Sequence, residues 1–212
     1  MTLYLADDLY LIAHEAQTGK PFLPEALLGI SMATGLLTEL VVVNAAVVED
    51  GWVAPGPAGP PPDRLAEALH QQLVGQYGNG VPIAEWISTN RRRVVDLVAD
   101  RLVRGGYADR EVQRRLGRST QRVVPNTNAD SFMRTQRLAS YLRNRLEVTE
   151  YDVYLAGLLV VVDGGAAHLE FRDSDQAHLD ELISLLRPVL QELLAHTQSA
   201  VEAYLRNPRA GG

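Results

Sequence analysis

Ten consecutive residues, 153–162 (VYLAGLLVVV), carry no charged side chain and constrain the fold more than any other segment. A helix that spans a membrane needs about 20 apolar residues, so this segment is too short to cross a bilayer. A helix that is apolar on all sides is buried in the interior of a protein. The sequence therefore predicts a buried central helix around which the rest of the chain packs.

A longer apolar segment, residues 26–48, has the length of a membrane span but is interrupted by polar side chains. The interrupting residues are Ser31, Thr34, Thr38, Glu39 and Asn44. Because polar and charged residues are costly in a bilayer, we interpret this segment as a second core helix, from about Pro24 to Val43.

The composition favours one folded domain over residues 1–212. Hydrophobic residues make up 46% of the chain, which is enough to fill a core, and the absence of cysteine excludes disulfides and cysteine-ligated metals. Residues 1–8 lack the basic start and the long apolar core of a secretory signal, so we expect a cytoplasmic protein. All but one of the basic residues are arginine, a bias that suggests a GC-rich, bacterial coding sequence.

Apolar residues at helical spacing predict further helices. Three of them cover residues 5–16, 63–75 and 83–87, and a fourth starts near residue 91. A fifth starts after residues 125–127 and is expected to turn Phe132, Ala139, Leu142 and Leu146 inward. The last covers residues 176–206 and is expected to break at Pro188. The predicted fold class is therefore mainly α: a single helical domain around a buried central helix, with short β-hairpins.

Two segments have the pattern of β-hairpins. Residues 46–53 are β-branched around Asp50-Gly51, a typical hairpin turn. Residues 107–124 predict a second, projecting hairpin with its turn near Leu116-Gly117-Arg118. The proline- and glycine-rich residues 55–62 are expected to form an exposed loop without regular structure.

Charge is unevenly distributed along the chain. The formal net charge is −6, yet residues 91–145 hold 14 arginines and only five acidic residues. Like charges that are held together repel one another unless an oppositely charged partner compensates them. The segregation therefore indicates a basic surface that faces an anionic partner.

Arg91, Arg92 and Arg93 are expected in the first turn of a helix, after the capping residues 88–90. The helix dipole disfavours cations at that end. A bound anion would reverse the effect, because free N–H groups and guanidinium groups would face the same negative charge. The alternative is that the three arginines point into water or pair with acidic residues of the chain.

The predicted hairpin carries further arginines, and the helix after it has a basic face. The residues concerned are Arg110, Val112, Arg114, Arg115, Leu116, Arg118 and Arg122 in the hairpin, and Arg134, Arg137 and Arg145 after it. A basic hairpin with an apolar residue near its tip suits an anionic membrane surface. It also suits the wing of a winged-helix nucleic-acid binder, and charge alone does not decide between the two.

Catalytic and metal-binding patterns are weak. The five histidines show no metal-ligand spacing, and neither a nucleophile elbow nor a phosphate-binding loop occurs. We therefore expect no enzyme activity, no cofactor and no metal. Glu39 is the acidic residue most open to a catalytic role, since burial would raise its pKa. A structural acid that bonds to backbone or pairs with an arginine is the preferred interpretation of Glu39.

Five segments, taken in their order, resemble the GPP34 family, which is named after Golgi phosphoprotein 3. They are LADDLYLIAHEAQTGK (5–20), GLLTELVVV (35–43), the short β segment that follows, ADRLVRGGY (99–107) and YLAGLLVVV (154–162). The similarity extends over about residues 3–206. The resemblance implies a mostly helical domain with a projecting hairpin that inserts into the bilayer, and peripheral membrane binding through the headgroup of phosphatidylinositol 4-phosphate. In eukaryotic members of the family, the resemblance associates this membrane binding with Golgi retention of glycosyltransferases.

The lipid site that the resemblance implies is matched in part. Eukaryotic members have a tryptophan and an arginine where this chain has Leu23-Pro24 and Ala33. Of a later arginine pair, Arg91 matches one member and Val94 stands at the other.

Our leading hypothesis is reversible docking on an anionic phospholipid membrane at its inner face. The headgroup-binding residues are predicted to be Arg91, Arg92, Arg93, Arg134 and Arg137, and the membrane-contacting hairpin residues Val112, Arg114, Arg115, Leu116 and Arg118. Nucleic-acid binding is the alternative, and the valine- and leucine-rich residues 94–103 disfavour it because a recognition helix needs exposed polar residues. A homo-oligomer is possible, and the sequence identifies no protein client.

Overall fold

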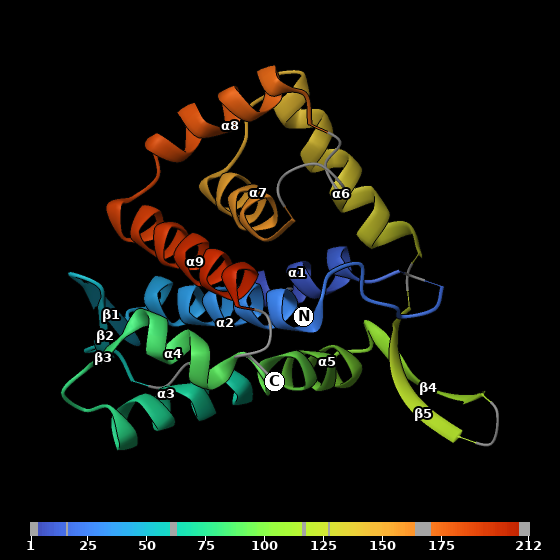
Figure 1. The fold of residues 1–212 in the computed structure, drawn as a ribbon, viewed down its shortest axis with the longest axis horizontal. Helices are drawn as coiled ribbons and strands as arrows, with labels where there is room; N and C mark the ends of the chain where they lie inside the picture. The colour runs from blue at the N-terminus through green and yellow to red at the C-terminus, as the bar shows by residue number, and fades with distance from the viewer. Residues whose placement is uncertain are drawn as a thin grey trace.

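The structure is a computed structural model that describes residues 4–15, 17–59, 63–115, 118–126, 128–163 and 171–207. The helices in these ranges are α1 (Leu5–Ala13), α2 (Glu25–Val42), α3 (Arg64–Gln76), α4 (Ile83–Asn90), α5 (Val94–Arg104), α6 (Asn128–Arg143), α7 (Glu150–Asp163), α8 (Asp173–Ser184) and α9 (Pro188–Arg206). The strands are β1 (Ala46–Glu49), β2 (Trp52–Pro55), β3 (Val81–Pro82), β4 (Ala108–Arg115) and β5 (Arg118–Pro125). Figure 1 shows the arrangement, and the predicted mainly α fold with short hairpins is confirmed.

Helix α2 lies between two groups of helices and packs against α1, α3, α4, α5, α7 and α9 (Figure 1). It begins after Pro24 and ends before Asn44, whose φ of 58° lies outside the right-handed helical region. Among the described helices, α2 is long and apolar enough to cross a membrane, but most of its side chains are buried inside the protein. The prediction of a core helix in this segment is confirmed.

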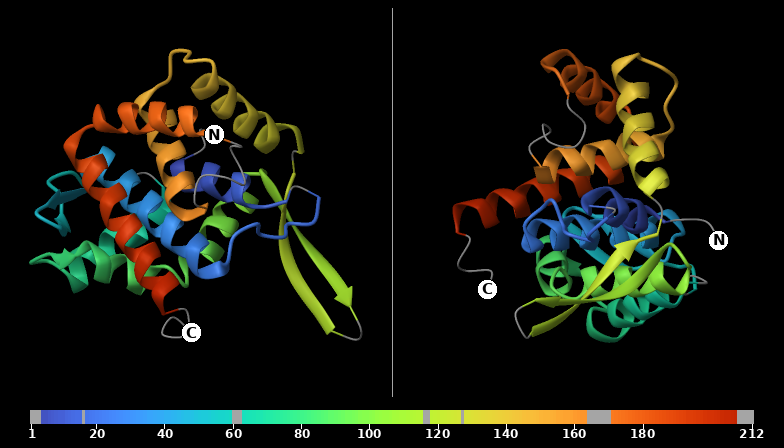
Figure 2. Two further views of the ribbon diagram at one scale, coloured as in Figure 1. Left: turned by 45° about the horizontal axis from the view of Figure 1, so that its top comes forward. Right: turned by 90° about the vertical axis from the view of Figure 1, so that its right-hand side faces the viewer.

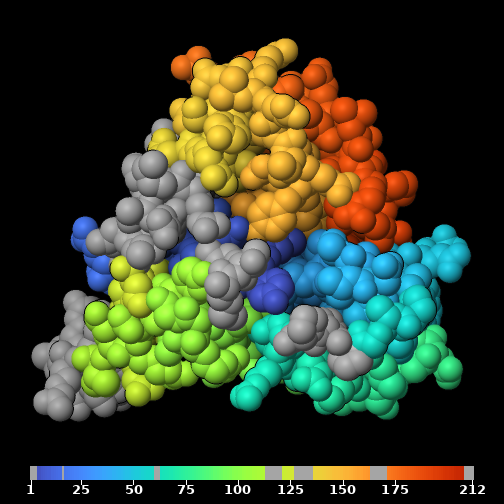
Figure 3. All heavy atoms as spheres, turned by 180° about the vertical axis from the view of Figure 1, so that it is seen from behind, coloured from blue at the N-terminus to red at the C-terminus, as the bar shows by residue number. Residues whose placement is uncertain are grey.

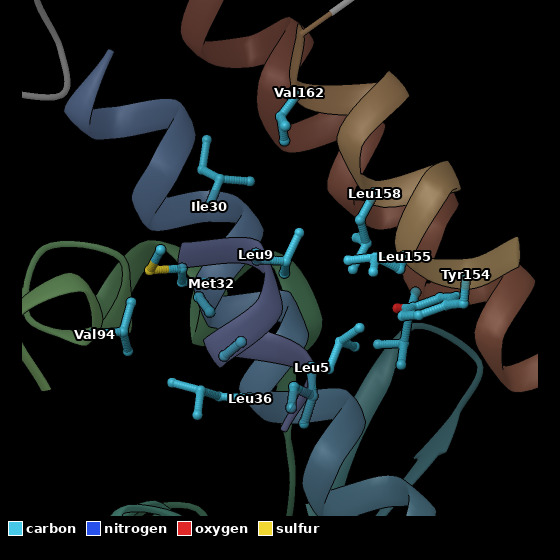
Figure 4. Close-up of a cluster of buried hydrophobic side chains, with 14 of the residues drawn as sticks. Leu5, Leu9, Ile30, Met32, Leu36, Val94, Tyr154, Leu155, Leu158 and Val162 are labelled. Atoms are coloured by element: carbon cyan, nitrogen blue, oxygen red, sulfur yellow. The ribbon is translucent and has the colours of Figure 1, made fainter. Parts of the chain in front are cut away.

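Helix α7 is buried as its apolar sequence predicts, and it packs against α1, α2, α8 and α9. Figure 4 shows side chains of α7 in one cluster with side chains from α1, α2 and α5. The labelled members of this cluster are Leu5, Leu9, Ile30, Met32, Leu36, Val94, Tyr154, Leu155, Leu158 and Val162. A single continuous core therefore joins the two groups of helices.

Helix α1 is enclosed on all sides by α2, α5, α6 and α7. All nine of its residues are buried, including Asp7 and Asp8. A buried carboxylate is costly unless it is paired or hydrogen-bonded, so this helix requires polar partners in the interior.

Strands β1 and β2 form the predicted first hairpin, with Glu49 opposite Trp52. Asp50 and Gly51 have φ angles of 51° and 79°, the positive values that a two-residue hairpin turn of this kind requires. The structure adds a third strand, β3, that pairs with β2 and that the sequence pattern did not predict. Pro55 belongs to β2, so the prediction of no regular structure from residue 55 onward is wrong at that residue. Residues 60–62 lie outside the described ranges.

The predicted break at Pro188 is confirmed, since α8 ends at Ser184 and Pro188 is the first residue of α9. The expectation that Leu146 points inward is wrong. Helix α6 ends at Arg143, Arg145 has a φ of 52°, and Leu146 is 50% exposed beyond this turn. Ala139 and Leu142 of α6 are buried as predicted.

Strands β4 and β5 form a long antiparallel hairpin that projects away from the helices (Figure 2). Its register runs from Ala108 opposite Pro125 to Arg115 opposite Arg118. The projecting hairpin and the position of its turn were therefore predicted from the sequence, although residues 116–117 themselves lie outside the described ranges.

Candidate functional site

The Arg91–Arg93 segment is a turn between two helices and not the first turn of a helix, which corrects the prediction. Ser88, Thr89 and Asn90, which were expected to cap a new helix, belong to α4. Arg91 is the residue after α4, and Arg93 is the residue before α5. Since a helix C-terminus attracts cations, the position of Arg91 carries no dipole penalty.

Asn90 explains why the two helices meet in a tight turn. Its side-chain amide donates to the carbonyl oxygen of Trp86 at 2.9 Å, and its Oδ1 accepts from Nε and Nη2 of Arg93 at 3.1 and 2.7 Å. Arg93 also donates to Oε1 of Gln72 on α3. This network directs Arg93 toward α3, while Arg91 lies on the side of α9.

A hollow of about 440 Å³ lies beside Arg91, and we call it the Arg91 hollow. The other described residues that line it are Ile30 of α2, Ala84, Ile87 and Ser88 of α4, Ser199, Ala200, Ala203 and Tyr204 of α9, and Asn207. One guanidinium group together with hydroxyl and amide groups is a suitable set for phosphate oxygens. The residues from α9 were not predicted, because no local sequence signal links them to Arg91 across more than a hundred positions.

Gly29 fixes the distance between α2 and the Arg91 turn. A Cβ atom at this position would lie 2.1 Å from the carbonyl oxygen of Arg91, so only glycine allows this close approach of the two backbones. The position of the Arg91 turn against α2 thus depends on a residue that carries no side chain.

The resemblance matches Arg91 to one predicted lipid-binding position and places Leu23-Pro24, Ala33 and Val94 at others, and of these others all but the exposed Pro24 are buried. Ala33 on α2 and Val94 on α5 are both 0% exposed, and Leu23 is 6% exposed. Among these positions, Arg91 alone places a cation at the hollow.

The structure describes only some of the side chains that were predicted for the hairpin surface. Val112 is 57% exposed on β4, whereas Arg110 pairs with Asp100 of α5 and is not available as a free cation. Arg114, Arg115 and Arg118 are placed by the strand register alone, because the side chains of residues 113–120 lie outside those described. Leu116 also lies outside the described ranges.

The structure separates the predicted arginines into three locations. The Arg91–Arg93 turn and the hairpin lie at opposite ends of α5, which has 11 residues and is therefore about 16 Å long. Arg134 and Arg137 belong to α6, which packs against α1 and α8. The exposed Arg137 lies 6.0 Å from the ring centre of Tyr141 on the same helix.

Arg101 comes from the basic segment but is not part of any surface. It is 1% exposed, and its guanidinium contacts three carboxylates. The distances are 2.8 Å to Asp7, 2.9 Å to Glu39 and 3.2 Å to Asp63. No local sequence signal distinguishes this arginine from its neighbours, apart from its place on the apolar face of α5.

Glu39 is the structural acid that the sequence analysis preferred. Its Oε1 accepts from the backbone N–H of Ala6 at 2.8 Å, and both its oxygens accept from Arg101. Burial raises the pKa of the Glu39 carboxyl, and the attraction of Arg101 offsets this only in part. Burial raises the pKa of Asp7 in the same way. Desolvation would lower the pKa of Arg101, but the three carboxylates outweigh it and hold that pKa above its ordinary value.

Among the described residues, no group of three histidine, aspartate or glutamate side chains has the arrangement of a metal site. Glu39 does border a cavity, which is a separate feature from the Arg91 hollow.

Comparison with protein families gives one match. The family model described as Golgi phosphoprotein 3 (GPP34) matches residues 5–203 of the chain. Comparison with individual curated proteins finds no match. The matched range includes α1 to α8, the projecting hairpin and nearly all of α9.

Proposed function

The chain belongs to the GPP34 family, and from this premise we propose that it is a peripheral membrane protein that binds anionic phospholipid headgroups. Membership of this family is consistent with lipid binding of the Golgi phosphoprotein 3 kind. The proposed headgroup is a phosphoinositide, with phosphatidylinositol 4-phosphate implied by the family. We further propose that the protein is not an enzyme and that it associates reversibly with the cytoplasmic face of the membrane.

The Arg91 hollow is the observation that carries this proposal. It is concave, it has a cation at its wall, and hydroxyl groups from α4 and α9 surround it. A phosphate ester in the hollow would accept from Arg91 and from the hydroxyls of Ser88 and Tyr204, and the charge-assisted bond from Arg91 is of the strong kind. The hydroxyl of Ser199 already donates to the carbonyl oxygen of Ala195 at 2.9 Å.

The hairpin supplies a second point of contact in this proposal. In the left-hand view of Figure 2, the C-terminal end of α9 and the outer ends of β4 and β5 are the lowest parts of the described protein. A flat membrane below the protein would therefore meet the region of the Arg91 hollow and the hairpin together. Helix α6 lies at the top of the same view, so Arg134 and Arg137 are left out of the proposed contact.

The hairpin register also supports an anionic partner. Arg115 and Arg118 are direct cross-strand neighbours, and like charges opposite one another destabilise a strand pair. Anionic headgroups would remove this repulsion, and basic residues near an anionic surface contribute about 1 kcal/mol each.

Helix α5, which precedes the hairpin, argues against the winged-helix alternative. Its buried face packs on α1, α2 and α3. The more exposed side carries Asp96, whose negative charge would repel a phosphate backbone, whereas the charge of Asp100 is compensated by Arg110. We therefore propose a membrane and not a nucleic acid as the partner.

Charge reversal in the Arg91 hollow tests the proposal. Arg91→Glu exchanges an attraction for a repulsion of about 1 kcal/mol each, so it should weaken binding to vesicles that contain phosphatidylinositol 4-phosphate by roughly thirtyfold. Arg172→Glu, on the exposed residue before α8, makes the same change of charge elsewhere and should have little effect. Equal weakening by both variants would show that net charge alone governs binding and would overturn the assignment to the Arg91 hollow.

Soluble inositol phosphate separates a headgroup site from a general membrane surface. We expect it to compete with vesicles for the wild-type protein and to have no effect on the residual binding of Arg91→Glu. Arg114→Glu combined with Arg115→Glu should abolish vesicle binding while leaving direct binding of the soluble headgroup, measured by titration calorimetry, intact. Loss of both activities in the hairpin variant would contradict the two-point arrangement.

A further inference from the structure

A second cavity, about 440 Å³ in volume, lies where the end of α2 meets the starts of α1, α3, α7 and α9. We call it the Tyr154 cavity. Figure 3 shows the face of the protein on which the atoms of α1, α2 and α7 adjoin. This volume is typical of sites for small molecules, which bury most of an organic ligand among apolar side chains.

The wall of the Tyr154 cavity is mainly apolar and aromatic. Leu5, Val42, Val43, Ala66 and Leu190 supply aliphatic surface. The rings of Tyr4, Tyr151 and Tyr154 supply aromatic surface, which attracts organic cations as well as apolar groups. Tyr4 already makes such a contact, since the guanidinium of Arg101 lies 4.8 Å from its ring centre.

Three hydroxyl groups of this wall, those of Thr38, Tyr151 and Tyr154, have no hydrogen left to donate. Thr38 donates to the carbonyl oxygen of Thr34 at 2.9 Å, so the 2.9 Å contact between Thr38 and Tyr154 uses the hydrogen of Tyr154. Tyr151 donates to Asp8 at 2.6 Å. Thr38, Tyr151 and Tyr154 therefore offer only acceptor oxygens toward the cavity.

The charge around the cavity has the sign that suits a cation. Asp7, Asp8, Glu39 and Asp63 carry four carboxylates against one guanidinium, that of Arg101. The N-termini of α1, α3, α7 and α9 each add about half a positive charge and the C-terminus of α2 adds about half a negative charge, which leaves a surplus of between one and two negative charges. At the rim, Glu150 and Arg187 form an ion pair at 2.8 Å, and their charges cancel.

We propose that the Tyr154 cavity binds a small organic cation, an amine or quaternary ammonium compound with an apolar body. The aromatic and aliphatic wall takes the apolar body, and the carboxylate side takes the positive charge. The cavity is separate from the Arg91 hollow, so this inference does not depend on the proposed membrane binding.

Titration calorimetry with hexyltrimethylammonium, hexan-1-ol and hexanoate tests the proposal, because the three probes share one apolar chain and differ in charge. Saturable binding with one site per chain is expected for the cation, about tenfold weaker binding for the alcohol, and no binding for the carboxylate. Equal affinity for the cation and the alcohol, or no saturable binding of the cation, would overturn the proposal.

Substitutions place the binding in the cavity. Val43 is 45% exposed and lines the cavity, so Val43→Trp should occlude it without disturbing the core, and cation binding should be lost. Val47→Trp is the matched control, because Val47 is similarly exposed on β1 and does not line the cavity. Glu150→Gln leaves the size of the rim unchanged, removes one negative charge and should weaken binding a few-fold. Unchanged binding by Val43→Trp would assign the cation to another surface and contradict the proposal. Both tryptophan variants should bind anionic vesicles like the wild type, which keeps this test distinct from that of the membrane function.

Discussion

Arg101 Nη1 lies 2.9 Å from Glu39 Oε2, and this ion pair joins α5 to α2 in the interior of the protein. The same guanidinium reaches Asp7 on α1 and Asp63, which caps α3 by accepting from the N–H groups of Leu65 and Ala66. Four helices therefore share one positive charge. The packing of these four helices therefore includes a buried charged network with Arg101 at its centre.

Removal of Arg101 is predicted to be severely destabilising. Arg101→Met keeps a similar volume but leaves three carboxylates without their cation, so the free energy of unfolding should fall by about 3 to 5 kcal/mol. Urea unfolding followed by circular dichroism measures this change. Arg104→Met, at the exposed end of the same helix, is the control and should change stability by no more than about 0.5 kcal/mol. Similar effects of the two variants would show that the buried network contributes little.

The stability of the protein should depend on His14 between pH 4 and 6.5. Burial lowers the pKa of His14 from its ordinary value of 6.5 to about 4, and its Nδ1 lies 2.7 Å from the carbonyl oxygen of Tyr10. In this range the unfolded chain binds a proton that the folded protein does not bind. The contribution of His14 is therefore complete above pH 6.5 and decreases as the pH falls toward 4, by roughly 3 kcal/mol in all.

His14→Phe isolates this contribution. The aromatic ring preserves the stacking on Tyr10, whose ring centre lies 3.8 Å away, but cannot be protonated. Asp7 and Glu39 have raised pKa values and oppose the trend in the wild type, but they are common to both proteins and cancel in the difference. The stability difference between the two proteins should change with pH in the stated direction. A difference that stays constant from pH 7 to 4.5 would contradict the buried, neutral state of His14.

Gly29→Ala is predicted to displace the Arg91 turn. The added Cβ would meet the carbonyl oxygen of Arg91 at 2.1 Å, and overpacking of this kind costs about 1 to 3 kcal/mol. Thermal unfolding should show the loss of stability, and vesicle binding should weaken with it. Gly75→Ala is the control, since a Cβ there meets nothing within 4 Å, and alanine should stabilise α3 by about 0.5 to 1 kcal/mol.

The hairpin should interact with lipid through Val112. Val112→Trp adds an amphipathic ring at an exposed strand position and should strengthen binding to anionic vesicles, whereas Val112→Asp should weaken it through charge repulsion. Vesicle flotation of the three proteins at equal salt gives the order directly. If the three proteins bind alike, the hairpin does not touch the membrane.

Much of the fold could be predicted because its signals are local. The apolar residues of α2 and α7, the Asp50-Gly51 turn and the break before Pro188 each define an element within a short window of sequence. The third strand could not be predicted in this way. Val81 and Pro82 form a strand only because β2 offers an open edge.

The candidate site was predicted less well, because it depends on contacts between distant residues. Arg91 was predicted together with Arg92 and Arg93, and only the family resemblance distinguished it from them. Tyr204 and Asn207 reach it only through the packing of α9. The three arginines were assigned to a helix start, since nothing in the sequence shows that Asn90 bonds back to Trp86 and lengthens α4. The sequence does not distinguish Arg101 from the surface arginines, because the carboxylates that surround it come from three other elements.

Co-sedimentation with vesicles at low salt tests the central claim most directly. Vesicles of phosphatidylcholine that contain phosphatidylinositol 4-phosphate should recover most of the protein, and neutral vesicles should recover little. The bound fraction should fall as salt is added, because exposed charges are screened. Equal and negligible recovery with both kinds of vesicle would contradict the account.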